Sequence, residues 1–285
     1  MKLCRYGERG AEKPGMIDGD GALRDLSGVI DDIGANVLSR DGLRRLMAID
    51  PSTLPRIDGM PRYGVPVAHV GKMLCVGMNY ADHAAETNAP VPEQPVLFMK
   101  ATTAIGGAND AAVIPRGSVK TDWEVELGVI IGEVARDVSV GDALDHVAGY
   151  AVINDVSERE FQLEHGGQWV KGKSCDTFGP IGPWLVTKDE VPDPQKLTLW
   201  LEVNGHRYQH GNTRTMVFGV AQLVSYISRY MTLMPGDVIS TGTPAGVGLG
   251  LHPPTYLKPG DVIELGIDGL GRQRQDVLAH PASSA

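Results

Sequence analysis

Two glutamates, Glu124 and Glu126, stand two residues apart in the otherwise apolar stretch TDWEVELGVIIG at residues 121–132. Side chains alternate between the faces of a strand, so both carboxylates project from one face, with Cβ atoms roughly 7 Å apart. Partly buried carboxylates repel each other and lose hydration, and a cation that prefers oxygen ligands, such as Mg²⁺, Mn²⁺ or Ca²⁺, removes both penalties. An edge strand with one solvated face explains the same pattern, and for this short motif alone it is the favoured interpretation.

A third carboxylate for such a site is Asp155, which ends the apolar run GYAVIND at residues 149–155. A carboxylate at the end of a buried strand is well placed to point into a site. The same residue also suits the N-cap of a following helix, SEREFQLEH, where Ser157 competes for that role.

The segment NYADHAAE at residues 79–86 contains a histidine and a carboxylate, His83 and Glu86, three residues apart. On a helix they share a face and can touch. A carboxylate bonded to one imidazole nitrogen fixes the tautomer and raises the basicity of the ring, which suits the activation of water. For two residues alone, a surface helix pair is the favoured interpretation.

Two loops complete the set of chemically interesting segments. Lys173 stands in KGKSCDTFGPIGPW at residues 171–184, where we expect a loop before an apolar strand. It is a surface residue by default, but it suits an anionic substrate or a developing enolate. In STGTPAGVG at residues 240–248, small residues let the backbone approach a ligand, and hydroxyl and N–H groups there suit a carboxylate. The spacing of a phosphate-binding P-loop is absent.

The elements that must position these residues belong to a mixed α/β, strand-rich fold. Strands and helices do not alternate regularly, so we expect a mixed β roll or sandwich. We predict a small N-terminal domain with a Pro- and Gly-rich linker at residues 1–66, and a catalytic domain at 67–285. Within the latter, hydrophobic patterning predicts strands at 72–77, 96–100, 123–131, 149–154, 197–203, 237–241 and 261–267, and helices at 79–87, 157–165 and 216–231.

Composition limits the classes of partner. The 285-residue chain has a formal net charge of −9 and no run of Lys and Arg, which argues against nucleic acid and anionic membranes. No apolar stretch approaches the ~18 residues of a membrane span, and the N-terminal residues lack the apolar core of a signal peptide. Three scattered cysteines, Cys4, Cys75 and Cys175, form neither a disulfide framework nor a zinc motif. We therefore expect a cytoplasmic protein.

In combination, seven segments resemble the fumarylacetoacetate hydrolase family, in the order found in that family. They are CVGMNYADHAAE (75–86), PVLFMKATTAIGG (95–107), DWEVELGVIIG (122–132), GYAVINDVSERE (149–160), KGKSCDTFGPIGP (171–183), LEVNGHRYQHGNTRTMVF (201–218) and PGDVISTGTPAGVG (235–248). Each segment is weak alone, and the ordered set is specific. The resemblance implies a mixed β-sandwich roll and a homodimer.

The resemblance also implies site residues. Glu124, Glu126 and Asp155 match the carboxylates that hold Mg²⁺ or Mn²⁺. His83 and Glu86 match the dyad that activates water. The remaining matches are Lys173 for the enolate, and Lys100, Arg159, Gln162 and Thr243 for substrate contact. The far end of the pocket is expected to involve Gln162, Glu164, His165 and Trp169.

The chemistry that the resemblance implies is hydrolysis of a C–C bond in an acylpyruvate, a 2,4-dioxo acid, to pyruvate and a carboxylic acid. The cation would act as a Lewis acid on the developing enolate. The length and N-terminal unit resemble the bacterial branch with 2,4-diketo-3-deoxy-sugar-acid hydrolases, so such a sugar acid is one candidate substrate. The alternatives are a ureidoglycolate lyase, an oxaloacetate decarboxylase, and a non-catalytic protein that binds a metal and a 2-oxo acid.

Overall fold

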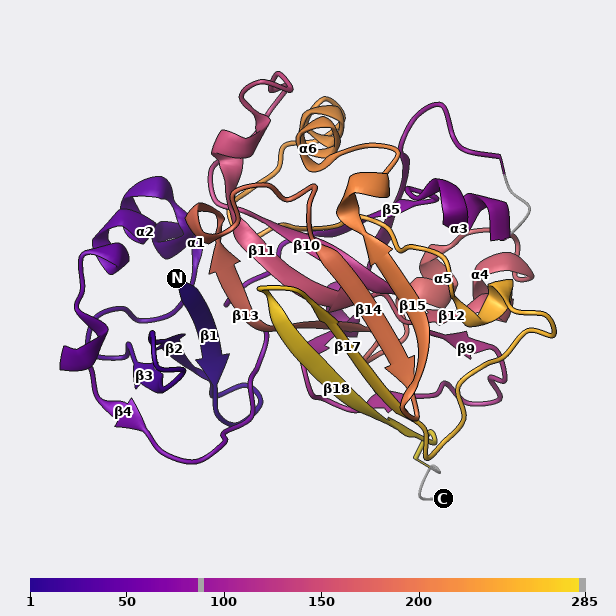
Figure 1. The fold of residues 1–285 in the computed structure, drawn as a ribbon, viewed down its shortest axis with the longest axis horizontal. Coiled ribbons are helices and arrows are strands. Elements are labelled where there is room, and N and C mark those ends of the chain that lie inside the picture. The colour runs from indigo at the N-terminus through magenta and orange to yellow at the C-terminus, as the bar shows by residue number, and fades with distance from the viewer. Residues whose placement is uncertain (87–89, 282–285) are drawn as a thin grey trace.

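The structure is a computed structural model that describes residues 1–86 and 90–281. Its largest sheet runs through the whole molecule, with N-terminal strands at one end and helices α3, α4 and α5 near the other (Figure 1). In spatial order the strands are β4 (Arg56–Ile57), β3 (Leu23–Asp25), β2 (Lys13–Ile17), β1 (Lys2–Tyr6), β13 (Gly179–Thr187), β11 (Val147–Asn154), β10 (Val125–Ile131), β16 (Val238–Ser240), β5 (Met73–Gly77) and β6 (Val96–Lys100). Strand β7 (Ile105–Gly107) pairs with β13 in parallel.

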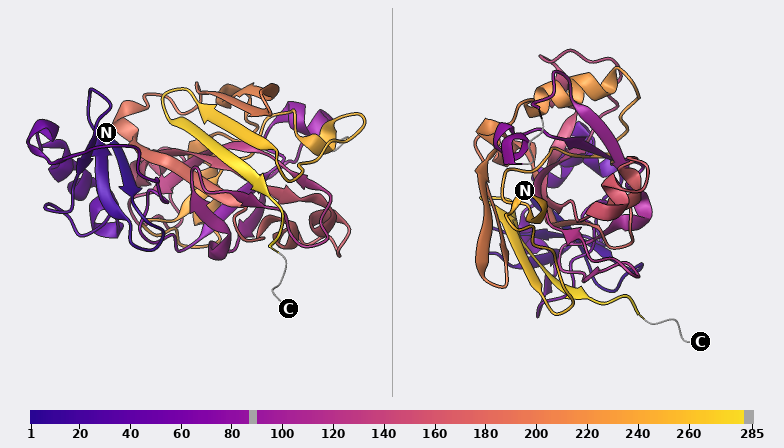
Figure 2. Two further views of the ribbon diagram at one scale, coloured as in Figure 1. Left: turned by 90° about the horizontal axis from the view of Figure 1, so that it is seen from below. Right: turned by 90° about the vertical axis from the view of Figure 1, so that its right-hand side faces the viewer.

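A second sheet packs against the first and completes a strand-rich roll (Figure 2). Its order is β15 (His206–Asn212), β14 (Thr198–Val203), β17 (Val262–Ile267), β18 (Gly271–Leu278) and β8 (Ala112–Val113). Two short strands, β9 (Thr121–Asp122) and β12 (Ser157–Glu158), form a separate pair beside the site. The expected mixed α/β, strand-rich fold is thereby confirmed.

The helices are short and lie around the sheets. They are α1 (Ala35–Leu38), α2 (Arg40–Met47), α3 (Ala81–Glu86), α4 (Arg159–Leu163), α5 (Val170–Lys173) and α6 (Val220–Ser228). Single 3-10 turns occur at Pro51–Thr53, Thr102–Ala104, Ala143–His146, Lys188–Glu190, Thr213–Thr215 and Gly248–Gly250. Among residues 1–86 and 90–281, every helix is too short or too polar to cross a membrane.

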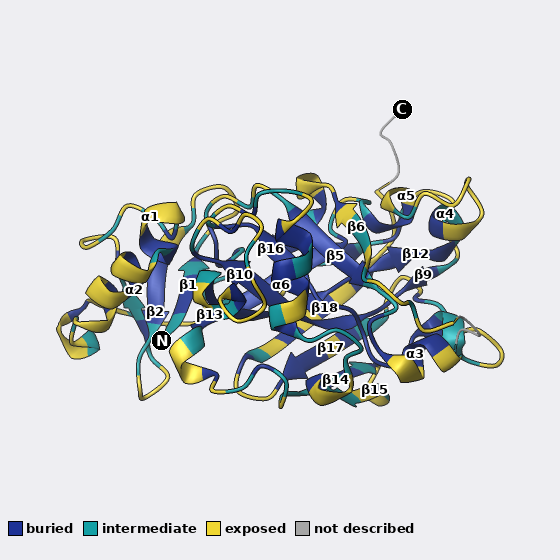
Figure 3. Ribbon diagram, turned by 90° about the horizontal axis from the view of Figure 1, so that it is seen from above, coloured by how far each residue is buried: buried dark blue, intermediate teal, exposed yellow. Residues whose placement is uncertain are grey.

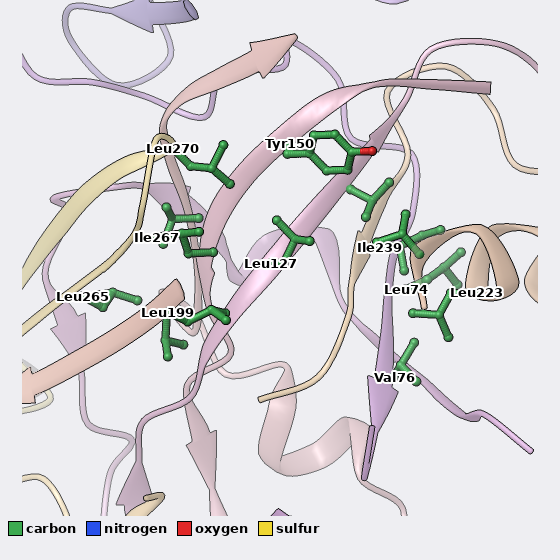
Figure 4. Close-up of a cluster of buried hydrophobic side chains, with 14 of the residues drawn as sticks. Leu74, Val76, Leu127, Tyr150, Leu199, Leu223, Ile239, Leu265, Ile267 and Leu270 are labelled. Carbon is green, nitrogen blue, oxygen red and sulfur yellow. The ribbon is translucent and has the colours of Figure 1, made fainter. Parts of the chain in front are cut away.

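The alternating pattern of β10 divides the interior into two cores. Val125, Leu127 and Val129 point into a core between the two sheets, where side chains of β10, β14, β17 and α6 meet (Figure 4). Ile130, on the opposite face with the glutamates, packs into a second core shared with the N-terminal segment. Both faces of the strand are therefore buried, as the burial colouring of β10 shows (Figure 3).

The strands and helices predicted within residues 67–285 are present, most of them with shifted bounds, and the three helices show why. The helix predicted at 216–231 forms only as α6, because Asn79 accepts from the N–H groups of Val217 and Phe218 and holds them outside the helix. The helix predicted at 157–165 begins at Arg159, because residues 157–158 pair with β9 as a strand. The helix predicted at 79–87 is α3, and residue 87 lies outside the described residues.

The predicted division at residue 66 stays a prediction. Strand β1 pairs with β13 through Lys2 opposite Val186 and Leu3 opposite Leu185, so the N-terminal strands extend the main sheet. The segment at 51–67 contains β4 and one 3-10 turn.

Candidate metal and catalytic site

Three carboxylates meet where β10 begins beside the end of the antiparallel strand β11. Val125 pairs with Asn154, so the residues just outside this pair, Glu124 and Asp155, become neighbours, and the Asp155 N–H donates to the Glu124 carbonyl at 2.9 Å. Glu124, Glu126 and Asp155 each offer an oxygen within 4.8 Å of the others, and they are 4%, 2% and 0% exposed. Because β10 lies between β11 and β16, the interpretation of a solvated edge strand is wrong.

Two buried lysines neutralise part of this cluster. Lys173 donates to Glu124 Oε2 at 2.7 Å and to Asp155 Oδ2 at 2.8 Å, while Lys100 donates to Asp155 Oδ1 from the other side. Lys173 is the last residue of α5, and not part of a loop as expected, so a helical turn fixes its direction. Asp155 is not a helix cap either, because Glu158 is the N-cap of α4.

Arg159 approaches the cluster from the first turn of α4. Its Nη2 lies 2.7 Å from Glu124 Oε1, and its Nε donates to Asp122 Oδ2 at 2.8 Å. Its Nη1 donates to Gln162 Oε1 at 3.0 Å, one turn along the same helix. The guanidinium therefore links Glu124, Asp122 and Gln162 in one buried network.

The electrostatics of the cluster are uneven. Burial works against ionisation of Glu124, but Lys173 and Arg159 outweigh it and hold its pKa below the usual value. Burial raises the pKa of Glu126 well above the usual value, and the charges of Asp155 and Glu124 raise it further. Burial acts to lower the pKa of Lys173, yet Asp155 and Glu124 outweigh it and raise that pKa.

These residues fit a divalent cation. Glu126 accepts from two neutral donors, Ser240 Oγ at 2.6 Å and the Gly242 N–H at 2.8 Å, which hold the carboxylate without balancing its charge. A cation among three buried carboxylates would supply that balance, and hard oxygen ligands suit Mg²⁺, Mn²⁺ or Ca²⁺. The set of three carboxylates could thus hold a divalent metal.

The histidine and glutamate of α3 form the predicted pair. His83 Nδ1 lies 2.8 Å from Glu86 Oε1, and Glu86 Oε2 accepts from the Gly246 N–H at 2.8 Å. A carboxylate can only accept at Nδ1, so the proton belongs on Nδ1 and the lone pair on Nε2. The two contacts of Glu86 fix the orientation of the ring.

The glycine-rich loop that follows β16 holds carboxylates through its backbone, and these carboxylates are the protein's own. Besides the bonds from Gly242 to Glu126 and from Gly246 to Glu86, the N–H groups of Gly248 and Leu249 donate to Asp122 at 2.7 and 3.0 Å. A side chain on Gly248 would place its Cβ 2.0 Å from the Thr255 carbonyl oxygen, so the close approach requires glycine there.

A pocket of about 230 Å³ opens beside the carboxylates. Of the predicted site residues it is lined by His83, Glu124, Glu126, Arg159, Gln162, Lys173 and Thr243, whereas Glu86, Lys100 and Asp155 support the wall from behind. The Thr243 hydroxyl donates to the Val125 carbonyl at 2.9 Å and accepts from Gln209, so the protein already uses its hydrogen. Trp169 lines the pocket as expected, whereas the exposed Glu164 and His165 do not.

Sequence reasoning missed three residues that position the cluster. Asp122 binds Arg159 and the loop at 248–249. The side-chain oxygens of Asn154 and Gln209 accept the N–H groups of Glu124 and Val125, at 3.1 and 2.9 Å, where β10 begins. Asp122 is a carboxylate within the stretch 121–132, two residues before Glu124, so it could have been singled out. No local pattern separates a buried Asn or Gln from a solvated one.

The sequence and the structure are similar to those of known proteins. Residues 72–278 match the family described as "Fumarylacetoacetate (FAA) hydrolase C-terminal". A protein from Burkholderia lata, named as a hydrolase, is 64% identical over 276 residues, which are 96% of this chain and 98% of the relative.

Solved structures resemble the whole chain. A fumarylacetoacetate hydrolase from Exiguobacterium antarcticum has a TM-score of 0.87 and 39% identity, with 98% of this chain and 100% of that chain covered. A protein from Mycobacterium abscessus named as a 2-hydroxyhepta-2,4-diene-1,7-dioate isomerase has a TM-score of 0.85 and 33% identity, covering 99% and 100%. Maleylpyruvate hydrolase from Sphingobium sp. SYK-6, in complex with manganese(II) ion and pyruvate, has a TM-score of 0.82 and 31% identity, covering 98% and 99%.

Proposed function

Because the chain belongs to the fumarylacetoacetate hydrolase family, we propose that it is a metal-dependent enzyme that hydrolyses a C–C bond of an acylpyruvate. The observation that carries the proposal is a pocket lined by two carboxylates of the buried cluster of three and by the histidine of a His–Glu pair. The similar maleylpyruvate hydrolase, found with manganese(II) ion and pyruvate, supports the same class of reaction. Mg²⁺ or Mn²⁺ is the proposed metal.

The reaction balances with water as the only co-substrate. The acylpyruvate R–CO–CH₂–CO–COO⁻ and water give R–COO⁻, pyruvate and one proton. The bond between C3 and C4 breaks, a C–O bond forms at C4, and C3 leaves with the electron pair as the pyruvate enolate before it is protonated.

The side chains divide the work of this reaction. His83 Nε2, with Nδ1 bonded to Glu86, takes a proton from the attacking water. The ammonium group of Lys173, which its carboxylate neighbours keep charged, balances the negative charge of the leaving enolate. A divalent cation held by Glu124, Glu126 and Asp155 would supply Lewis-acid stabilisation of that same charge.

The test is a set of substrates measured with Mn²⁺ or Mg²⁺, then with a chelator. Acylpyruvates should release pyruvate only with metal, while ureidoglycolate and oxaloacetate cover the lyase and decarboxylase alternatives. His83→Ala should slow hydrolysis by about 10²–10⁴-fold. Loss of CO₂ from oxaloacetate needs no attacking water, so turnover of oxaloacetate alone, indifferent to His83→Ala, would favour decarboxylation and overturn the proposal. An inert protein that still binds pyruvate would favour the binding role.

A homodimer and a cytoplasmic location belong to the proposal as well. Light scattering on the purified chain measures the first, and fractionation of the producing cells measures the second.

A further inference from the structure

One part of the pocket lining, called here the apolar wall, lacks charged and polar side chains. It consists of Phe98, Trp169, Leu163, Met78 and Leu249. A volume of about 230 Å³ lies below the ~300–1,000 Å³ typical of pockets for drug-sized ligands, so the occupant is small. A 2-oxo acid whose oxo-acid end is held at the carboxylate cluster would place its other end on this wall.

Contacts between rings fix the position of this wall. The Lys173 ammonium lies 5.1 Å from the centre of the Phe98 ring, so the wall begins beside the carboxylate cluster. Trp169 continues it, with its ring edge-on to Phe98 at 5.3 Å between centroids. The indole also covers Gly77 so closely that a Cβ there would lie 2.3 Å from Trp169 Cζ3.

The cations that line the pocket are already engaged by the protein. Arg159 donates from Nε to Asp122 at 2.8 Å and from Nη1 to Gln162 at 3.0 Å, while its Nη2 forms an ion pair with Glu124 at 2.7 Å without a hydrogen bond. Lys173 bridges Glu124 and Asp155. Among the residues that the structure describes, no other Lys or Arg lines the pocket. The three residues outside the description, Thr, Asn and Ala at 87–89, carry no charge in the sequence.

We propose that the acyl group of the substrate is short and apolar, and that Trp169, supported by Phe98, is the residue that selects it. A second carboxylate would lose its hydration against this wall without gaining a cation, and a row of hydroxyl groups would meet few uncharged polar side chains, Gln162 and Thr243 among the described lining residues. The wall therefore disfavours 2,4-diketo-3-deoxy sugar acids and acyl groups that end in a carboxylate. This inference rests on the proposed function, because that function places the 2-oxo acid end at the metal ligands.

The first test measures binding without turnover. The probes are 2-oxohexanoate and 2-oxoadipate, which have the same number of carbons and differ in a terminal carboxylate, titrated by calorimetry into the Mn²⁺-loaded protein. Wild type should bind 2-oxohexanoate at least about tenfold more tightly. Trp169→Arg, which adds a cation to the wall, should erase or reverse that preference, and Trp169→Phe should keep it. Equal or tighter binding of 2-oxoadipate by wild type would overturn the inference.

Matched controls separate selection from loss of folding. Trp200 lies on β14 beneath the guanidinium of Arg207, which is 4.7 Å from its ring, and does not line the pocket. Trp200→Phe should leave the ratio of the two affinities unchanged, and thermal melting shows which variants are folded. If Trp169→Arg does not fold, Gly77→Ala displaces the same indole without a charge and should weaken the binding of 2-oxohexanoate.

Steady-state kinetics distinguish this inference from the proposed function. A binding preference for 2-oxohexanoate without hydrolysis of any acylpyruvate would support the apolar wall and refute the hydrolase. Efficient hydrolysis of acylpyruvates that end in a carboxylate would support the hydrolase and refute the wall as the selecting feature. If neither 2-oxo acid binds the Mn²⁺-loaded protein, the inference is overturned, and release of pyruvate from acylpyruvates still decides the hydrolase.

Discussion

At the scale of single residues, Glu126 combines good hydrogen bonding with poor charge balance. Its carboxylate accepts from Ser240 and Gly242, yet burial, Asp155 and Glu124 raise its pKa. Such a residue is costly in the metal-free protein and useful in the metal-loaded one, because a cation removes the repulsion that neutral donors leave in place.

We expect Glu126→Gln to separate these two effects. The amide oxygen can keep both hydrogen bonds, so the metal-free variant should be at least as stable as metal-free wild type. Mn²⁺ at one hundred times its dissociation constant should add about 2.7 kcal/mol to the unfolding free energy of wild type. In the variant, affinity should fall at least about tenfold and most of this gain should disappear. Thermal melting without Mn²⁺ measures the stability of the metal-free protein, and melting with Mn²⁺ measures the gain from the metal. If Mn²⁺ stabilises the variant as much as it stabilises wild type, Glu126 is not a metal ligand.

The role of Asp122 in holding Arg159 is testable by Asp122→Asn, which replaces one carboxylate oxygen by an amide nitrogen. It joins Arg159 to the N–H groups of Gly248 and Leu249, so all its described partners are donors. Asp122→Asn replaces one acceptor by a donor and leaves Arg159 with less negative charge. We expect kcat/KM to fall by about 10–100-fold with little change in Mn²⁺ affinity, as for other residues that orient a site from behind. Kinetics beside calorimetry checks this, and a parallel loss of metal affinity would show a different role.

At the scale of elements, the loop that follows β16 connects the sheet to the His83–Glu86 pair of α3 through contacts with Glu86. Gly246 bonds to Glu86, and a Cβ added at Gly250 would lie 2.7 Å from the Glu86 carboxyl group. Since that neighbour is the end of a side chain, Gly250→Ala should move Glu86 away from His83 without unfolding the protein. We expect kcat to fall at least about tenfold with unchanged Mn²⁺ affinity. Gly28→Ala, which meets nothing within 4 Å, is the control. Unchanged kcat in Gly250→Ala would show that Glu86 does not need this position.

The elements also show what the sequence could and could not predict. Alternation along β10 places Glu124 and Glu126 on one face, and this needs only local geometry. Their burial depends on strands from remote parts of the chain, because β10 pairs with β16 and β16 pairs with β5. The strands β10 and β16 are more than 100 residues apart in the sequence. The local pattern contains no sign of this pairing and therefore favoured the wrong alternative. The shortened α6 has the same origin, because Asn79 binds Val217 and Phe218 from a remote part of the chain.

At the scale of the whole molecule, the strands that carry the carboxylate cluster, β10 and β11, share a core with the N-terminal segment. Leu26, Ile33 and Leu46 belong to the same buried cluster as Ile130 of β10 and Ile153 of β11. The N-terminal strands also extend the main sheet through β1 and β13. A shared core and a shared sheet favour one cooperative folding unit over two independent ones.

Leu26→Ala tests whether the predicted N-terminal domain folds with the rest. Leu26 is fully buried, so its truncation should cost about 2–5 kcal/mol of unfolding free energy. The four tryptophans stand at 123, 169, 184 and 200, outside residues 1–66, but Trp184 contacts Lys2 and Tyr63. The test is therefore made in a Trp184→Phe background, where the three remaining tryptophans report the other part of the chain. For one cooperative unit, the urea midpoint of this fluorescence should shift to lower urea in Leu26→Ala. The exposed neighbour Val29 provides the control, because Val29→Ala removes a side chain that is 47% exposed. An unshifted tryptophan transition in Leu26→Ala would instead establish that residues 1–66 unfold independently of β10 and β11.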